Sequence, residues 1–415
     1  MKKVEIRDAA TIWIPRCVNT IIKNTPRSEL KTICADYNQA KDLIFLMSSQ
    51  LMGSYAKAIR KEKEIFIHLN AKVLREAVYY NYLPILKFLR DKNVIETDDS
   101  YKVGFYSKKF WLTDYALKKG IREVEITNKK VLKNLTEYKE CLLEKAETNT
   151  ITSHLLKVNP TVTLPNSEDL LEKGKAMVKS KTKNKKGKCY KLRGKKPKAE
   201  TIKTRNYRYI EDDIDLFRQL TNGGIKVPVV GSERSGGRII CAFALMPSWI
   251  RDEVRIDGEE TVEADYSCLH PNIANKLYGS NETSITHKIV AKFLGKTKSE
   301  IKKEHLSFFN SKYNLYINFD VTDYYKAHHP ELFKNVLNIK DLDIQNGTEN
   351  TVTYAIFKEE VKLMSRVFEK FAKQGIKALY VYDAVRVKKS DSKLAVQIMN
   401  QTAEEFLVRT GTTLE

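Results

Sequence analysis

The chain has 415 residues, enough for two or three domains. Its formal net charge of +21 indicates a polyanionic partner, because Lys and Arg release condensed counterions when they bind phosphate groups. Nucleic acid is the first partner to expect, and an anionic membrane surface is the second. No uninterrupted apolar run reaches the roughly 18 residues of a membrane span, and the N-terminus lacks the apolar core of a signal peptide. We therefore expect a soluble, cytoplasmic protein with no membrane partner.

Residues 1–165 form the first predicted domain. Apolar side chains recur with helical spacing from Leu43 to Ile59 and from Lys72 to Leu89, and no motif with a chemical mechanism occurs there. We expect a mostly helical N-terminal domain that serves either as a scaffold or as a platform for a template or partner.

The most basic stretch of the chain follows. Between residues 173 and 208 it holds sixteen Lys or Arg residues and one Glu, interleaved with Gly and Tyr. Such a run is typical of a solvated or disordered segment, but the tyrosines favour nucleic acid, since bases stack on aromatic rings while cations contact phosphates. We predict a basic nucleic-acid-binding loop or linker over residues 166–212. Its candidate contacts are Lys185, Lys186, Arg193, Lys195 and Lys196.

An acidic cluster comes next, formed by Glu211, Asp212, Asp213 and Asp215. It precedes an apolar, periodic stretch. We predict the first turn of a helix, where carboxylates complement the helix dipole, rather than a metal site.

The six cysteines are scattered along the chain, with no Cys-x-x-Cys pair. This spacing argues against a zinc site and against a disulfide scaffold. We expect reduced, mostly packed cysteines.

Two aspartates in the C-terminal half each lie at the end of a predicted strand. Asp265 ends a strand that leads into a helix stopping near Gly279. Asp383 lies in an alternating stretch, residues 377–388, which predicts a strand or a tight strand pair with Asp383 on an apolar face. An unpaired charge there is costly, so we expect a cation nearby. A lone Asp is most often a turn former, but two on adjacent strands can hold two Mg²⁺ ions, or Mn²⁺ instead, for phosphoryl transfer.

A helix face that carries two lysines is predicted between these aspartates in the sequence. Lys298, Lys302, Leu306 and Asn310 recur every four residues, which places them along one face of a helix. The lysines suit a triphosphate, although an ordinary surface helix explains the same pattern. Upstream, Gly237 and Arg238 precede a short apolar strand, where glycine allows close backbone approach to a ligand or simply makes a hairpin turn.

Over residues 231–410 these patterns, in this order, resemble the family A DNA polymerases and the related single-subunit phage-type RNA polymerases. Asp265-Tyr266-Ser267 resembles the Asp-Tyr-Ser of polymerase motif A, and Tyr382-Asp383 resembles the His-Asp of motif C.

The fingers and primer–template motifs have counterparts as well. Lys298-x3-Lys302-x7-Asn310 resembles the Arg-x3-Lys-x7-Tyr of the fingers helix. Gly237-Arg238 resembles the Thr-Gly-Arg that contacts the primer–template.

The resemblance implies an α+β fold, with a right-hand palm and fingers over residues 213–415 and the helical N-terminal domain as thumb or template grip. It implies that Asp265, Asp383 and the Tyr266 backbone carbonyl hold the metals, with Lys302 as a further catalytic group. It places the incoming nucleotide at Lys298, Lys302, Asn310, His270 and Tyr266.

His270 stands five residues after Asp265, where the DNA polymerases carry a bulky Glu and the RNA polymerases a Gly. A bulky side chain favours deoxynucleotides, although His can also donate to a 2′-hydroxyl. The alternative is a helix-start residue before Pro271 with no ligand role.

The activity that follows is metal-dependent, template-directed nucleic-acid polymerisation, with a DNA polymerase favoured over a single-subunit DNA-directed RNA polymerase or a primer-synthesising enzyme. The expected partners are a DNA template, a primer or RNA product, and nucleoside triphosphates. Two rival interpretations are a non-catalytic nucleic-acid-binding protein and a metal-dependent nuclease.

Overall fold

The structure, a computed structural model, describes most of the chain. The described residues are 2–61, 67–68, 82–98, 108–113, 115–116, 120–184, 187–193, 206–221, 223–311, 319–348 and 350–414.

The chain divides into two compact units. The first comprises residues 1–143, 165–227 and 245–251, and the second comprises residues 144–164, 228–244 and 252–415. One boundary between the units lies at residues 164/165, next to the predicted limit at 165, whereas no boundary lies near the predicted limit at 212. Both candidate aspartates belong to the second unit.

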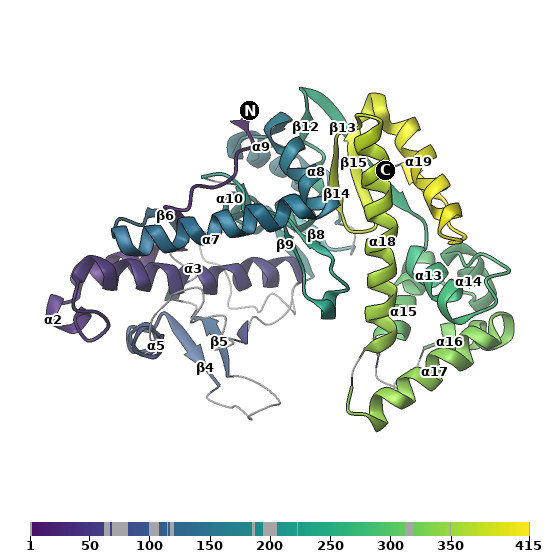
Figure 1. Cartoon of the computed structure of the whole chain (residues 1–415), viewed down its shortest axis with the longest axis horizontal. Helices are drawn as coiled ribbons and strands as arrows, with labels where there is room; N and C mark the ends of the chain where they lie inside the picture. Colours follow the sequence, from purple (N-terminus) through teal and green to yellow (C-terminus); the bar gives the residue numbers. More distant parts are fainter. Residues whose placement is uncertain are drawn as a thin grey trace. The chain divides into compact units, whose positions relative to one another are not determined.

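The first unit combines helices with small sheets (Figure 1). Its helices are α1 (Arg16–Asn24), α2 (Arg27–Leu30), α3 (Tyr37–Lys61), α5 (Leu83–Asp91), most of α7 (Lys129–Thr148), α9 (Ser167–Lys179), α10 (Ile210–Thr221) and α12 (Ser248–Arg251). Its strands are β1 (Lys2–Lys3), β2 (Thr11–Pro15), β3 (Ile67–His68), β4 (Ile95–Thr97), β5 (Lys109–Leu112), β6 (Ile121–Glu125), β8 (Cys189–Lys191) and β9 (Tyr207–Tyr209). β2 pairs with β6, β5 pairs with β3 and β4, and β8 pairs with β9.

Helix α3 confirms the helical spacing predicted from Leu43 onward. Leu43, Ile44, Met47 and Leu51 are buried in the core of the unit, one helical turn after another. The second predicted stretch lies partly outside the described residues, and its end forms α5. The strands β2 to β6 are elements that the sequence pattern did not predict.

The acidic cluster forms the first turn of α10, as predicted. Glu211, Asp212 and Asp213 all lie in that turn. Asp213 is buried and accepts hydrogen bonds from Arg208 Nε at 2.5 Å and Trp249 Nε1 at 2.7 Å. The cluster therefore lies at the start of a helix and binds neighbouring side chains within its own unit.

The second unit is built on an antiparallel sheet. Its strands are β7 (Val162–Leu164), β12 (Arg255–Ile256), β13 (Glu259–Tyr266), β14 (Ala378–Val381), β15 (Ala384–Lys388) and β16 (Thr412–Leu414), and a separate pair is formed by β10 (Val229–Val230) and β11 (Ile239–Ile240). The order is β7-β12-β13-β15-β14, and β16 also pairs with β13. All four residues of β14 are buried, so both faces of this strand are covered.

The rest of this unit is mostly helical. They are α8 (Thr150–Val158), α11 (Ala242–Leu245), α13 (Leu269–Tyr278), α14 (His287–Leu294), α15 (Lys298–Asn310), α16 (Val321–His328), α17 (Pro330–Gln345), α18 (Thr351–Lys373) and α19 (Ser392–Glu405). The long helix α18 is central, because it packs against α8, α13, α17 and α19 (Figure 1). The predicted helices that follow Asp265 and Asp383 are confirmed as α13 and α19, and the predicted helix face with two lysines lies on α15.

Arg386 links the two central strands, β13 and β15, through side-chain hydrogen bonds. This buried side chain on β15 donates to Thr261 Oγ1 at 3.1 Å and to Glu263 Oε2 at 3.3 Å, both on β13. It also pairs with Asp252 at 2.8 Å. A buried guanidinium with this many partners fixes the register that aligns Asp265 with Ala384.

His154 on α8 makes the stability of the second unit depend on pH. Its buried Nε2 accepts a hydrogen bond from the Ala378 N–H, and burial, with the Lys157 charge, lowers its pKa to about 4. The unfolded chain takes up this proton near pH 6.5, so the native state loses stability as the pH falls from 6.5 toward 4. We expect a loss of about 3 kcal/mol from this group.

Urea unfolding at pH 7 and pH 4.5 measures this effect. The His154→Gln variant keeps a hydrogen-bond acceptor but does not titrate, so its stability should fall less than that of the wild type. Equal losses in the two proteins would show that His154 does not contribute.

Candidate active site

Two adjacent strands bring Asp265 and Asp383 to one cavity. Asp265 lies near the end of β13 and pairs with Ala384, the residue after Asp383, while the Tyr266 N–H donates to the Asp383 carbonyl at 3.4 Å. Both aspartates line a cavity of about 260 Å³. Asp265 reaches the cavity from β13 and Asp383 from the turn before β15, and their role as metal ligands stays a prediction.

The tight strand pair predicted over residues 377–388 is also confirmed, with one correction. Val381 pairs with Ala384, so Tyr382 and Asp383 form the two-residue turn between β14 and β15. Tyr382 has a φ of 65°. Asp383 therefore lies at the tip of a hairpin, not on the apolar face of a strand. The sequence pattern placed it on a strand because the alternation of apolar residues continues through the turn.

The Asp383 carboxyl is buried close to the Glu360 charge. Burial raises its pKa, the Glu360 charge raises it further, and His270 and Arg238 only partly compensate. Within the described part of the chain, Asp265 and Asp383 do not belong to a group of three metal-ligating side chains. The two carboxylates thus converge on the cavity as a pair.

Arg238 and His270, both partly buried, form an ion cluster with the fully buried Glu360 near Asp383. Arg238 Nε donates to Glu360 Oε1 at 2.9 Å, and its Nη2 pairs with Glu360 Oε2. His270 Nε2 lies 2.5 Å from Glu360 Oε2 and 2.8 Å from Arg238 Nη2. A carboxylate only accepts, so His270 donates through Nε2. Burial raises the Glu360 pKa, but the His270 hydrogen bond and the two positive partners outweigh this and lower it.

Glu360 and Phe357 are site residues that the sequence analysis missed. Glu360 is fully buried on α18, and the Arg238 guanidinium carbon lies 3.5 Å from the centre of the Phe357 ring. A signal was present in the sequence, because Glu360 falls four residues after Ile356 and four before Met364 on the apolar stripe of a helix. A charge on such a stripe requires a partner.

Arg238 and His270 are thus held by Glu360. Arg238 was predicted to contact nucleic acid, and His270 to contact the nucleotide sugar. His270 lines the cavity. Both roles stay predictions, and any ligand of Arg238 has to share it with Glu360.

Gly236 allows this cluster to pack against α18. Its φ is 63°, and a Cβ there would lie 2.5 Å from Phe357 Cβ and 2.6 Å from the Lys358 nitrogen. Gly237 also has a positive φ, of 78°, but a Cβ there would meet only Val230, at 3.8 Å. Gly236 is therefore required for space as well as for backbone conformation.

We expect Gly236→Ala to destabilise the protein by about 2–4 kcal/mol, from the left-handed backbone and the overlap with α18. Gly237→Ala should cost about 1 kcal/mol, because only the backbone term applies. Thermal or urea unfolding of both variants measures the difference. Equal losses of stability in the two variants would mean that α18 moves away from the added Cβ of residue 236 at no cost.

Helix α15 brings Lys302 to the cavity that Asp265 and Asp383 line. A capping box between Thr297 and Glu300 starts this helix, so its first turn is well defined. Lys302 is exposed and lines the cavity, whereas Lys298 is exposed and does not line it. Lys302 thus shares a cavity with both aspartates, and its predicted role at the triphosphate stays a prediction.

Asn310 and Tyr266 also line the cavity, and both are held by the protein. Asn310 donates to the Leu306 carbonyl at 2.8 Å and accepts from Thr353 at 2.9 Å. The Tyr266 hydroxyl donates to the Met399 carbonyl at 2.6 Å. Their predicted contacts with a nucleotide, and the metal contact of the Tyr266 carbonyl, stay predictions.

Of the predicted contacts in the basic segment, only Arg193 is described by the structure. Lys185, Lys186, Lys195 and Lys196 lie outside the described residues. Arg193 pairs with Asp212 at 2.5 Å and with Asp215 at 3.5 Å. A phosphate would compete with these carboxylates for its guanidinium.

Cys268, His287 and His305 line the same cavity, and none of them was predicted as a site residue. Burial raises the pKa of Cys268 to about 12 and lowers the pKa values of His287 and His305 to about 4 and about 3. Both imidazoles are therefore neutral at pH 7.

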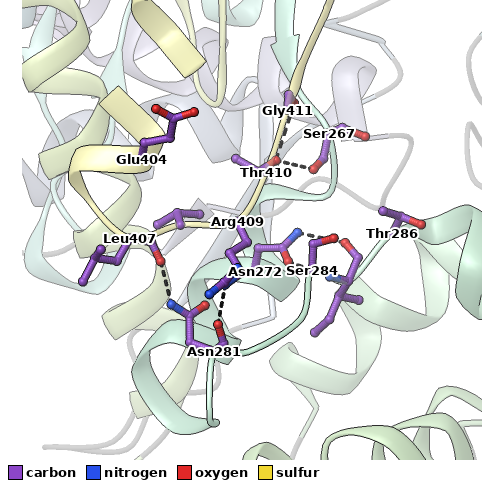
Figure 2. Close-up of a pocket in the computed structure, with 12 residues that line it drawn as sticks. Ser267, Asn272, Asn281, Ser284, Thr286, Glu404, Leu407, Arg409, Thr410 and Gly411 are labelled. Atoms are coloured by element: carbon purple, nitrogen blue, oxygen red, sulfur yellow. Dashed lines mark hydrogen bonds between the residues drawn. The ribbon is translucent and has the colours of Figure 1, made fainter. Parts of the chain in front are cut away.

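A second cavity, of about 510 Å³, lies beside the loop before β16 (Figure 2). Its polar groups bind one another: Thr410 donates to the Ser267 carbonyl at 2.5 Å, and Asn281 donates to the Leu407 carbonyl at 2.8 Å. None of the predicted site residues lines it. The hydrogen bond from Thr410 to Ser267 links the end of β13 to the C-terminal segment.

No helix among the described residues is both long and apolar enough to cross a membrane.

No family model and no curated protein matches the chain. Among solved structures, the chain is similar to the POL domain of Pol1 from M. smegmatis in complex with DNA primer-template and dNTP, with 10% sequence identity and a TM-score of 0.30. The match covers 68% of this chain and 65% of that chain, so this chain spans slightly less than two thirds of its length. A similarity at this level does not define the fold, and what the site does has to be inferred from its own residues.

Proposed function

We propose that this protein is a metal-dependent nucleic-acid polymerase that joins nucleotides at the cavity lined by Asp265, Asp383 and Lys302. One observation carries the proposal: strand pairing brings two carboxylates, far apart in the chain, to a single cavity that an exposed lysine of α15 also lines. Two carboxylates and a cation are the groups that phosphoryl transfer from a triphosphate requires.

The donor set of the two aspartates fits a hard divalent cation. Asp265 and Asp383 offer carboxylate oxygens, the ligands that Mg²⁺ prefers, and strand geometry keeps them adjacent. Bound Mg²⁺ would supply charge neutralisation for the triphosphate and a more acidic attacking hydroxyl. In this proposal β13, β14 and β15 are the palm, and α15 is the fingers helix.

The remaining residues of the cavity position the substrate. Lys302 binds the triphosphate and neutralises the charge that develops on the leaving pyrophosphate. Glu360 holds His270 at the cavity wall by accepting a hydrogen bond from its Nε2, and there its ring meets the sugar of the nucleotide. A bulky ring at this place favours deoxynucleotides over ribonucleotides.

Primer extension tests the proposal. The full chain is incubated with Mg²⁺ and labelled dNTPs or NTPs, with and without primer and template, and the products are separated by length. We expect Mg²⁺-dependent, template-directed extension with dNTPs preferred. Salt-sensitive binding with no Mg²⁺-dependent product would favour a nucleic-acid-binding protein, and shortening of the primer would favour a nuclease.

A further inference from the structure

Three side chains with metal-ligating atoms converge beside the carboxylate pair. Cys268 precedes α13, His287 begins α14, and His305 lies within α15. The two Nδ1 atoms are 3.0 Å apart, and Cys268 Sγ lies 3.5 Å from Nδ1 of His287 and 4.0 Å from Nδ1 of His305. Among the described residues, this is the group of three whose ligand atoms all lie close enough to share one metal ion.

We propose that Cys268, His287 and His305 bind a borderline-soft transition metal ion, with zinc as the best fit. A tetrahedral ion with Zn–N bonds of about 2.0–2.1 Å and a Zn–S bond of about 2.3 Å places its nitrogens about 3.3 Å apart and its sulfur about 3.6 Å from each. The three observed separations lie within a few tenths of an ångström of these values.

The ligand chemistry distinguishes this site from the aspartate pair. Thiolate and imidazole groups select zinc or similar ions, whereas Mg²⁺ takes oxygen ligands. All three residues also line the 260 Å³ cavity. A fourth coordination position would therefore face the cavity and hold water, as in zinc sites with three protein ligands.

A tyrosine with an unpartnered hydroxyl packs against His305. Tyr325 is fully buried and packs its ring 5.7 Å from that of His305. Among the described residues its hydroxyl has no hydrogen-bond partner, which is costly for a buried polar group. A metal-bound water at the fourth position would give the Tyr325 hydroxyl a partner.

Metal content and the cobalt spectrum test this site without any measure of polymerase activity. The full chain, without a histidine tag, is reduced, stripped with a chelator, loaded with Zn²⁺ or Co²⁺ and freed of excess ion. We expect one ion per chain, a thiolate-to-cobalt charge-transfer band, a tetrahedral cobalt spectrum and a higher melting temperature after loading.

Matched variants locate the site. Cys268→Ser should abolish the charge-transfer band, and His287→Gln should abolish retention of the ion. Cys241→Ser should change neither, although Cys241 is buried to the same 7% exposure as Cys268. An Asp265→Asn/Asp383→Asn double variant should still retain cobalt, which separates this site from the proposed Mg²⁺ site.

Ion retention and the cobalt spectrum of the wild type test the proposal even if a variant fails to fold. Absence of retained ion or of a charge-transfer band in the folded wild type would overturn the proposal. Cys268, His287 and His305 would then be a buried hydrogen-bonded cluster. A band that persists in Cys268→Ser would also contradict it, because the thiolate ligand would have to be another cysteine.

Discussion

Asp265→Asn and Asp383→Asn each lower the rate of nucleotide incorporation by a factor on the order of 10³ or more, as expected for the loss of charge stabilisation in phosphoryl transfer. Asn has the same shape as Asp but no negative charge, so it binds Mg²⁺ far more weakly. The change is measured by single-turnover extension of a labelled primer at saturating Mg²⁺ and nucleotide.

Stability and nucleic-acid binding serve as controls for this prediction. Both aspartates line the cavity and Asn keeps their shape, so the Asn variants should fold normally and bind primer–template with near wild-type affinity. Asp257→Asn is the matched control, since Asp257 lies in the β12–β13 turn with a φ of 51° and pairs with Lys377 away from the cavity. Asn tolerates this backbone conformation. Near-full incorporation by the double Asp265/Asp383 variant would refute the assigned roles.

Glu360→Gln destabilises the protein by about 3–5 kcal/mol, because it leaves the Arg238 guanidinium and His270 without their buried counter-charge. Glu360 is fully buried, so water cannot replace it as a partner. The amide keeps the shape of the side chain, so the loss reports electrostatics more than packing. Urea unfolding at pH 7 measures the free energy of unfolding.

The matched control lies on the same helix. Glu369 on α18 is partly exposed and pairs with Lys373 at 3.0 Å and Arg366 at 2.7 Å, so Glu369→Gln should destabilise the protein far less than Glu360→Gln does. Equal losses in the two variants would mean that Glu360 does not anchor Arg238. A double-mutant cycle with Arg238→Met should show strong coupling, since the two side chains contact each other directly.

Local elements of the second unit were predicted correctly from the sequence. Alternation over residues 377–388 gave the β14–β15 hairpin, and four-residue spacing from Lys298 gave α15. Such patterns are local, because the backbone geometry of each strand or helix sets the spacing of its apolar residues. Asp383 was misplaced on a strand face because a two-residue turn does not interrupt the alternation.

Long-range contacts explain what the sequence did not show. Arg238 and Glu360 are separated by 122 positions, and only the packing of α18 brings them together. Cys268 lies 19 positions from His287, which lies 18 positions from His305, so no short-range cysteine or histidine motif marks the cluster. The expectation of no zinc site depended on such motifs, and the proposed metal site challenges it.

Pyrophosphate release measures the central claim most directly. Wild-type protein extends a labelled primer on a template while pyrophosphate is quantified in the same reaction, with Asp383→Asn in parallel. The account predicts one pyrophosphate per nucleotide joined, only with Mg²⁺, and almost none from the variant. Release of mononucleotides from the primer, or equal pyrophosphate from wild type and variant, would contradict it.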